Sequence, residues 1–221
     1  MAEAEASKMV ENAFRDINIA FVNELAKSFD DTNVDIMKVI NASATKPFGY
    51  MPFYPGLGVG GHCIPVDPEY LISAAKDRGF DHEILKVARN INDGMIHYIA
   101  DKLDTFVLGN KGLKPKILIL GLAYKPNIGD IRESQGARLE ELLISKDYSV
   151  KTYDPYVSLT NESIATLLNV AEVVILATAH DIFNNLVDQL NGYSNVKLLI
   201  DTSNTVNSQD LKYAQYNGIG R

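Results

Sequence analysis

The stretch Lys116–Lys125, KILILGLAYK, decides the fold of the second half of this chain. A continuous apolar run of this length, ended by a glycine, is typical of a strand that is buried on both faces of a parallel sheet. Further runs predict strands at 149–155, 171–180 and 196–203. Helical spacing predicts helices at 134–146 and 181–190. Buried strands that alternate with helices indicate a parallel sheet covered on both faces.

The first half of the chain follows a helical pattern. Apolar residues recur at helical spacing over residues 4–29, 31–40, 69–76 and 81–107. We therefore predict an α/β protein with an all-α domain at 1–112 and a Rossmann-like parallel α/β domain at 113–221. The apolar stripe over 81–107 exceeds what one domain of this size would cover, so we expect this helix to pack against its copy in a homodimer.

Composition excludes several classes of function. The 221 residues carry a net charge of −7 and no run of Lys or Arg, so neither nucleic acid nor a membrane surface is an expected partner. One cysteine and four dispersed histidines exclude a disulfide framework and a Cys-rich zinc module, and no metal site is predicted. There is no apolar run of transmembrane length and the N-terminus is polar, so we expect a cytoplasmic protein.

The irregular segment at 41–68 contains the candidate site. Its core, Pro55–Pro68, reads PGLGVGGHCIPVDP, and its four glycines are Gly56, Gly58, Gly60 and Gly61. Closely spaced glycines let backbone N–H groups approach a ligand with no Cβ in the way. Cys63 follows this cradle, and one helical turn would set the Asp67 carboxylate over its thiol. The pattern follows a loop and not a strand, so it is no dinucleotide fingerprint.

Other interpretations of this segment stay open. A lone cysteine is often a small buried apolar residue, and glycine and proline often only shape a loop. His62 either forms a hydrogen bond or packs, and the sequence does not decide between them.

Two further groups of residues suit a site. Lys8 and Asn12 share one helix face at a spacing of four, although such a pair is usually solvated. In GLAYKPNIGDIRES, a strand ends at Gly121 and Tyr124, Lys125 and Arg132 follow it. Ligands bind beyond the carboxyl ends of parallel strands, so the Lys125 and Arg132 cations at this place suit an anionic ligand. A charged surface loop is the alternative.

Three stretches together resemble one family, the NAD-dependent nucleotide-sugar 6-dehydrogenases of the UDP-glucose/GDP-mannose dehydrogenase type. They are AEASKMVENAF, TKPFGYMPFYPGLGVGGHCIPVDPEYL and GLAYKPNIGDIRES, and they span both predicted domains. The form ATKPFGYMPFYPG resembles the UDP-N-acetylglucosamine branch more than the UDP-N-acetylmannosamine branch. UDP-N-acetylmannosamine and UDP-glucose remain alternative substrates, and NADP remains an alternative cofactor.

The resemblance implies a two-step oxidation of sugar C6 to a uronic acid with two NAD⁺. Cys63 matches the nucleophile, which forms a thiohemiacetal and then a thioester. Lys8 and Asn12 match the pair that stabilises the oxyanion, and Asp67 matches the carboxylate that assists the final water.

The resemblance also implies residues that bind ligands. Those matching substrate contacts are Tyr54, Gly56, Gly58 and Gly60 in the loop, and Tyr124 and Lys125 in the second domain. Arg132 matches a residue that reaches toward NAD, and Lys46 lies near the position of a basic residue that crosses to a partner subunit's site.

The sequence departs from the family pattern in two ways. No strand–helix unit with G-x-G-x-x-G precedes Lys8, so we expect a truncated piece or one half of a split enzyme, inactive alone, with the main NAD site outside it. Asp201–Asn204 reads DTSN where the family often has D-x-R-N, which removes one expected contact to uridine diphosphate. A non-catalytic nucleotide-binding or assembly module, and a self-standing redox or thioester enzyme using Cys63 with His62, are the rival classes.

Overall fold

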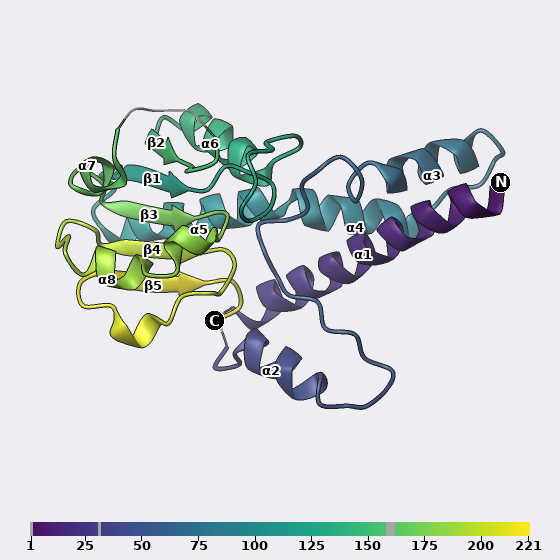
Figure 1. The fold of residues 1–221 in the computed structure, drawn as a ribbon, viewed down its shortest axis with the longest axis horizontal. Helices are drawn as coiled ribbons and strands as arrows, with labels where there is room; N and C mark the ends of the chain where they lie inside the picture. The colour runs from purple at the N-terminus through teal and green to yellow at the C-terminus, as the bar shows by residue number, and fades with distance from the viewer. Residues whose placement is uncertain (1, 31, 158–161) are drawn as a thin grey trace. The chain divides into compact units, whose positions relative to one another are not determined.

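The computed structural model describes residues 2–30, 32–157 and 162–221 (Figure 1). The chain forms two compact units, which we describe separately. Unit 1 comprises Met1–Met95 with Gly220–Arg221, and unit 2 comprises Ile96–Ile219. The sequence predicts a domain boundary at 112, which stays a prediction. Residues 96–112, which this prediction places in the helical domain, belong to unit 2 in the structure.

Unit 1 consists of helices and one long irregular segment. Its helices are α1 (Ala2–Phe29), α2 (Ile36–Ser43), α3 (Asp67–Lys76) and α4 (Glu83–Asp93). Helix α1 packs against α3 and α4 through an apolar cluster that contains Ala13, Ile72 and Leu85. The helix expected at 31–40 begins at Ile36, where Asp35 caps it by accepting the Met37 N–H at 2.9 Å, and Asp31 lies outside the described residues.

The prediction of one continuous helix at 81–107 is wrong in one respect. Gly94 separates α4 from α5 (Met95–Gly109), although Gly94 itself keeps right-handed helical dihedral angles. The apolar stripe of α5 is already buried, since Met95, Ile99 and Leu103 are fully covered. Within 81–107 the exposed large apolar side chains are those of Ile84 and Val87 in α4, which are 69% and 55% exposed, and past this range Leu108 at the end of α5 is 78% exposed.

Unit 2 contains the parallel sheet that the apolar runs predict. Its strands are β1 (Lys116–Leu120), β2 (Ser149–Tyr153), β3 (Val173–Leu176), β4 (Leu198–Asp201) and β5 (Gln215–Gly218). All neighbouring pairs are parallel, in the order β2-β1-β3-β4-β5 (Figure 1). Every residue of β3 and β4 is buried, so both faces of the central sheet are covered. The predicted α/β fold, a helical domain followed by a parallel α/β domain, is confirmed.

Short elements connect the strands of unit 2. The helices are α6 (Gln135–Ser145), α7 (Ile164–Leu168) and α8 (Leu186–Leu190), with 3₁₀ turns at Asp181–Phe183 and Ser208–Asp210. The helix expected at 181–190 is therefore a 3₁₀ turn followed by α8. The sequence does not indicate β5, whose residues QYNG carry no apolar run, nor α7.

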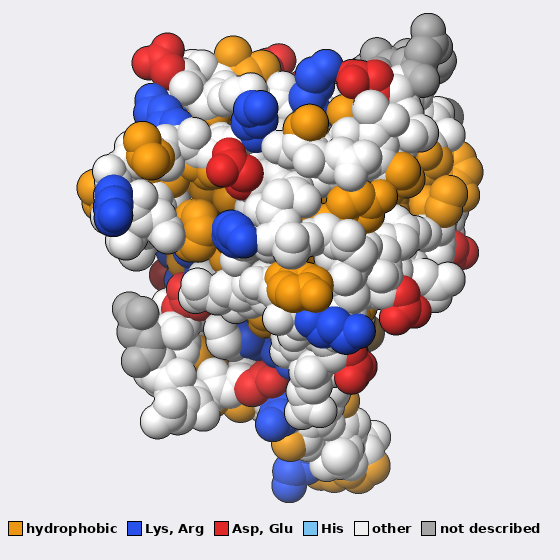
Figure 2. All heavy atoms as spheres, turned by 90° about the vertical axis from the view of Figure 1, so that its left-hand side faces the viewer, with side chains coloured by type: hydrophobic (Ala, Val, Ile, Leu, Met, Phe, Trp, Pro, Cys, Tyr) orange, Lys and Arg blue, Asp and Glu red, His pale blue; other side chains and the backbone are white. Residues whose placement is uncertain are grey.

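The surface of the molecule carries charges of both signs. In Figure 2, Lys and Arg side chains lie interspersed with Asp and Glu on the face that it shows. Such a face offers no extended basic track for a phosphate backbone. Within the described residues, none of the helices is long and apolar enough to cross a membrane.

Gly121, directly after β1, is expected to be essential for the stability of unit 2. Its φ is +85°, and an added Cβ would lie 2.5 Å from the carbonyl oxygen of Thr178. Gly121→Ala should therefore lower the free energy of unfolding by about 1–3 kcal/mol, measured by urea unfolding followed by circular dichroism. Gly109→Ala is the matched control, because an added Cβ there meets nothing within 4 Å. An equal loss in both variants would contradict this account.

Candidate functional site

The first candidate site, in unit 1, begins on helix α1. Lys8 and Asn12 lie one turn apart on one face, with Lys8 largely exposed and Asn12 buried. Arg15 donates from Nη1 to Oδ1 of Asn12 at 3.0 Å. This bond turns the NH₂ group of the Asn12 amide the other way. Nothing in the sequence points to Arg15, because arginine on an exposed helix face is common.

A single backbone turn joins the cysteine to the carboxylate. The N–H groups of Val66 and Asp67 both donate to the carbonyl oxygen of Cys63, at 3.2 and 2.9 Å. Asp67 is the first residue of α3, so the helical turn expected between Cys63 and Asp67 is present. Cys63 is a free cysteine of intermediate exposure, and not a fully buried packing residue.

The Asp67 carboxylate points back to α1. Its Oδ2 accepts a hydrogen bond from Nδ2 of Asn12 at 2.6 Å and lies 3.4 Å from Nζ of Lys8. The Asp67 side chain is only 10% exposed, so water screens this contact weakly. The structure thus brings together three predicted residues from two segments that are distant in sequence.

The glycine-rich loop before Cys63 has no regular secondary structure. Buried and half-exposed residues alternate along it, with the side chains of Leu57 and Val59 buried at 6% and 4% exposure. The three predicted substrate-loop glycines, Gly56, Gly58 and Gly60, occupy the half-exposed positions. The apolar side chains thus hold the loop, while its accessible side carries no Cβ atoms.

The remaining predicted residues of unit 1 lie apart from this cluster. Tyr54 is 48% exposed and donates from its hydroxyl to Oδ1 of Asn41 at 3.5 Å. Lys46 is exposed in the turn after α2. Among the described residues, no contact joins Lys46 to Lys8 or Asp67.

The second candidate site, in unit 2, lies at the carboxyl edge of the sheet. The strand order places β2 on one side of β1 and β3 on the other, and ligands of open parallel sheets bind where the order reverses in this way. The loop that follows β1 carries Tyr124 and Lys125, whose Nζ lies 5.5 Å from the centre of the Tyr124 ring. Arg132 forms an ion pair with Asp130 on the same loop at 2.6 Å. The predicted residues of unit 2 therefore share one loop at the expected edge.

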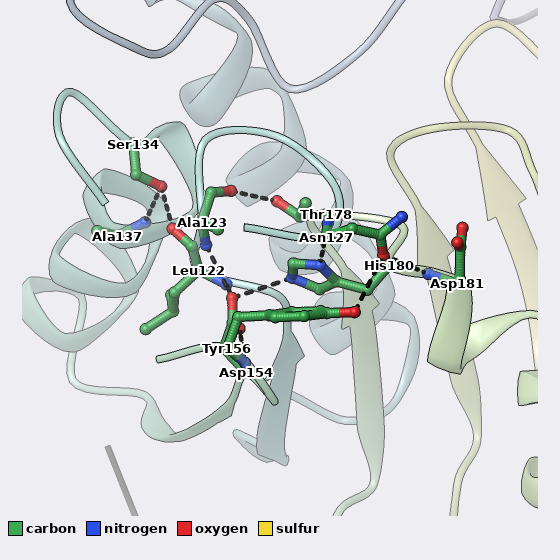
Figure 3. A network of polar contacts seen from close by, with 10 residues as sticks. All are labelled: Leu122, Ala123, Asn127, Ser134, Ala137, Asp154, Tyr156, Thr178, His180 and Asp181. Carbon is green, nitrogen blue, oxygen red and sulfur yellow. Dashed lines mark hydrogen bonds and ion pairs between the residues drawn. The ribbon is translucent and has the colours of Figure 1, made fainter. Parts of the chain in front are cut away.

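A buried network that the sequence analysis did not anticipate fixes the base of this loop (Figure 3). Oδ2 of Asp154 accepts the N–H groups of Leu122 and Ala123 at 2.7 and 2.8 Å and lies 3.0 Å from Nε2 of His180. Nδ1 of His180 accepts the Asn127 N–H at 2.8 Å. Because Nδ1 accepts, Nε2 carries the proton and donates to Asp154. The two side chains clamp both ends of the segment between Leu122 and Asn127.

Only a partial signal for this network is present in the sequence. Asp154 and His180 lie near the ends of the strands predicted at 149–155 and 171–180, and polar side chains there can meet at the edge of a sheet. Their pairing depends on which strands are neighbours, and spacing along the chain does not contain that information.

The same network tests whether unit 2 fits a dinucleotide. In dinucleotide-binding folds, backbone N–H groups of the first strand–helix turn receive the pyrophosphate. Here the Asp154 carboxylate occupies the N–H groups of Leu122 and Ala123 in that turn. The residues of this turn do not fit NAD, and only Arg132 remains of the cofactor contacts expected in unit 2.

The segment DTSN, where an arginine is often found in the family, forms a structural turn. Asp201 accepts the N–H groups of Ser203 and Val206 at 3.0 and 2.7 Å. Asn204 is buried and forms two hydrogen bonds to the backbone of Ile219, at 2.8 and 3.1 Å. These residues hold the end of β5, and no cation replaces the expected arginine within this segment.

Comparisons with known proteins assign both parts of the chain to one family. Residues 2–94 match the model of the UDP-glucose/GDP-mannose dehydrogenase family, central domain, and residues 118–208 match the UDP binding domain of the same family. The chain is 36% identical to UDP-N-acetyl-D-mannosamine dehydrogenase of Pyrococcus horikoshii over 99% of its length and 52% of the relative's. It is also 36% identical to UDP-N-acetyl-D-glucosamine 6-dehydrogenase of Pseudomonas aeruginosa, over 95% of its length and 50% of the relative's.

A solved structure shows the same fold. The UDP-D-ManNAc dehydrogenase from Pyrococcus horikoshii superposes with a TM-score of 0.86 at 34% identity, over 97% of this chain and 51% of that chain. The chain belongs to the UDP-glucose/GDP-mannose dehydrogenase family, whose members are NAD-dependent dehydrogenases. It spans about half the length of the curated relatives that it matches.

Asp154 is expected to make the stability of unit 2 depend on pH. Burial raises the pKa of Asp154, but hydrogen bonds from His180 and three backbone N–H groups outweigh burial and lower the pKa from 3.8 to about 2. The contribution of the Asp154 carboxylate to the free energy of unfolding is therefore fully present above pH 3.8, and it is lost as the pH falls through about 2. The difference in unfolding free energy between wild type and Asp154→Asn should shrink by about 2 kcal/mol between pH 5 and pH 2. A constant difference in urea titrations across this range would contradict the assignment.

Proposed function

We propose that this chain forms the catalytic-cysteine and UDP-binding parts of a nucleotide-sugar 6-dehydrogenase, which oxidises C6 of a UDP-N-acetylhexosamine to the uronic acid. The observation that carries the proposal is the convergence of Lys8 and Asn12 on Asp67, one backbone turn after the free Cys63. A charged amine, an amide donor and a carboxylate beside a thiol are the groups that oxidation through a thioester requires.

Cys63 acts as the nucleophile. Its thiolate adds to the C6 aldehyde of the substrate and forms a thiohemiacetal, whose oxidation leaves a thioester on the sulfur. Two molecules of NAD⁺, bound in turn, would each take up one of the two hydrides that leave C6. The cysteine lies between the half-exposed glycine loop and the hydrogen-bonded turn to Asp67, and these two segments hold it in place.

Lys8 and Asn12 stabilise the negative oxygen that develops on C6. The amine of Lys8 is accessible, and the Asn12 amide has a second N–H beside the one that binds Asp67. Arg15 keeps the NH₂ group of Asn12 turned toward Asp67 by occupying Oδ1. Asp67 accepts a proton from the water that releases the uronic acid.

The nucleotide part of the substrate is held by backbone and by cations. The half-exposed glycines Gly56, Gly58 and Gly60 let the substrate approach the backbone closely, and Tyr124 and Lys125 contact the uridine diphosphate. Arg132 reaches toward the cofactor, and Lys46 serves the site of a partner subunit.

The sugar is assigned only as an N-acetylhexosamine. The relatives named for N-acetylmannosamine and N-acetylglucosamine are equally similar to this chain, at 36% identity. The motif ATKPFGYMPFYPG favours UDP-N-acetylglucosamine. Because the β1–α6 turn does not fit a dinucleotide, the chain alone should turn over no UDP-sugar with NAD⁺.

The homodimer expected through the helix at 81–107 is part of this proposal. Helix α4 supplies the accessible apolar side chains Ile84 and Val87, since the stripe of α5 is buried. Two copies that pack through α4 would remove these side chains from water.

Protection of Cys63 by substrate tests the proposed function. We expect UDP-N-acetylglucosamine, at ten times its dissociation constant, to slow alkylation of Cys63 by iodoacetamide about tenfold, because bound sugar covers the thiol. Mass spectrometry of the single cysteine gives the rate. Free N-acetylglucosamine is the control and should have no effect, since it lacks the nucleotide. An inert thiol that no UDP-sugar protects would favour a non-catalytic nucleotide-binding module.

The oligomeric state tests the proposed interface. Light scattering at micromolar concentration should give twice the mass of one chain, and Val87→Asp should give the mass of one chain because it places a charge on the apolar α4 surface. Asn184→Asp, which adds the same charge at an exposed polar position of unit 2, should remain a dimer. A monomeric wild type would overturn the interface.

A further inference from the structure

Four polar side chains lie buried between α1 and α4 in unit 1. Asp16, Asn23 and Asn92 are 0% exposed and Arg89 is 5% exposed. Burial raises the pKa of Asp16 despite the attraction of Arg89, and Oδ2 of Asp16 has no hydrogen-bond partner among the described residues. A buried ion pair of this kind is often no more stabilising than apolar residues of the same volume. Packing alone therefore does not account for these residues.

The hydrogen bonds of this group run in one direction. Oδ1 of Asp16 accepts from Nη1 of Arg89 at 2.7 Å and from Nδ2 of Asn92 at 2.9 Å. A carboxylate only accepts, so it fixes which end of the Asn92 amide faces it. Oδ1 of Asn92 is consequently turned to Asn23 and accepts from Nδ2 of Asn23 at 3.0 Å.

The last member of the row reaches the glycine loop. Since Nδ2 of Asn23 is engaged by Asn92, its Oδ1 faces the loop and accepts the Gly56 N–H at 2.9 Å. Turning any one amide over would place oxygen against oxygen at one end and NH₂ against N–H at the other. Nδ2 of Asn92 also donates to the backbone carbonyl oxygen of Asp16 at 3.0 Å, so the side chain and the backbone of Asp16 favour the same amide orientation. Through the two amides, Asp16 thus sets an oxygen against the Gly56 N–H.

The loop needs such an anchor. It has no regular structure, and glycine loses more backbone freedom on ordering than any other residue. The side chains of Leu57 and Val59 hold the loop against the unit, but apolar packing is not directional. A backbone hydrogen bond to Gly56 defines the position and orientation of the chain at the start of GLGVGG.

We propose that Asp16, Asn92 and Asn23 are positioning residues that hold the Gly56 end of the nucleotide-sugar loop through a hydrogen-bond row of fixed direction. They touch no substrate. They set where the half-exposed backbone of Gly58 and Gly60 meets the ligand. The role of the loop in binding UDP-sugar rests on the proposed function, whereas the anchoring of Gly56 does not.

Two substitutions test the row. Asn92→Asp sets a carboxylate against both acceptors of Asp16, its Oδ1 and its backbone carbonyl oxygen, and removes the donor between them. Asn23→Ala removes the acceptor of the Gly56 N–H without burying a charge, and it leaves the contacts between Asp16 and Asn92 in place. Asn90→Asp is the matched control, because Asn90 is exposed on the same helix and gains the same charge as Asn92→Asp.

The first readout is hydrogen exchange at the Gly56 amide, measured by NMR together with the amides of α1 and α4. We expect exchange at Gly56 to be about tenfold faster in Asn92→Asp and in Asn23→Ala, and unchanged in Asn90→Asp. The proposal is overturned if Asn92→Asp folds and leaves Gly56 exchange unchanged. Where Asn92→Asp does not fold, Asn23→Ala must accelerate Gly56 exchange or the proposal fails.

The second readout is the dissociation constant for UDP-N-acetylglucosamine by calorimetry. It should rise about tenfold in Asn92→Asp and in Asn23→Ala, and stay unchanged in Asn90→Asp. A wild-type chain that binds no UDP-sugar contradicts the proposed function. In that case the exchange rates alone still decide whether the row anchors Gly56.

Discussion

The hydrogen bond from Asn12 to Asp67 is the contact on which the arrangement of unit 1 around Cys63 depends. At 2.6 Å and out of water, it ties the first helix to the start of α3, and the cysteine lies one turn before that point. Helix α1 and the irregular loop would otherwise meet only through apolar packing, which has no preferred direction. The bond therefore joins two separate segments and places an amine, an amide and a carboxylate together, one backbone turn from Cys63.

A buried carboxylate that accepts hydrogen bonds from N–H groups occurs in both units. Asp16 determines the direction of the row that ends at Gly56, and Asp154 holds the N–H groups at the end of β1. In each case a buried carboxylate orders an irregular segment that carries predicted ligand contacts. Burying a charge costs free energy unless it is fully hydrogen bonded, so such groups are suited to specify one geometry and not to add general stability.

The sequence predicted the fold where the signal is local. The apolar run at 116–120 gave β1, and helical spacing gave α1, because strand and helix periods are properties of neighbouring residues. The pattern failed at Gly94, which divides the expected helix 81–107, and at β5, whose QYNG has no apolar run and is defined only by pairing with β4.

What the sequence by itself determined is the family resemblance, the two kinds of domain, and the candidate residues Lys8, Asn12, Cys63 and Asp67. Only the tertiary structure decided that Asn23 meets Gly56 and that His180 meets Asp154. Helical and strand periods repeat within a few residues, so they can be read along the chain. A hydrogen bond between distant residues depends on which faces pack together and which way each amide or imidazole is turned, and that is settled only when the chain is folded.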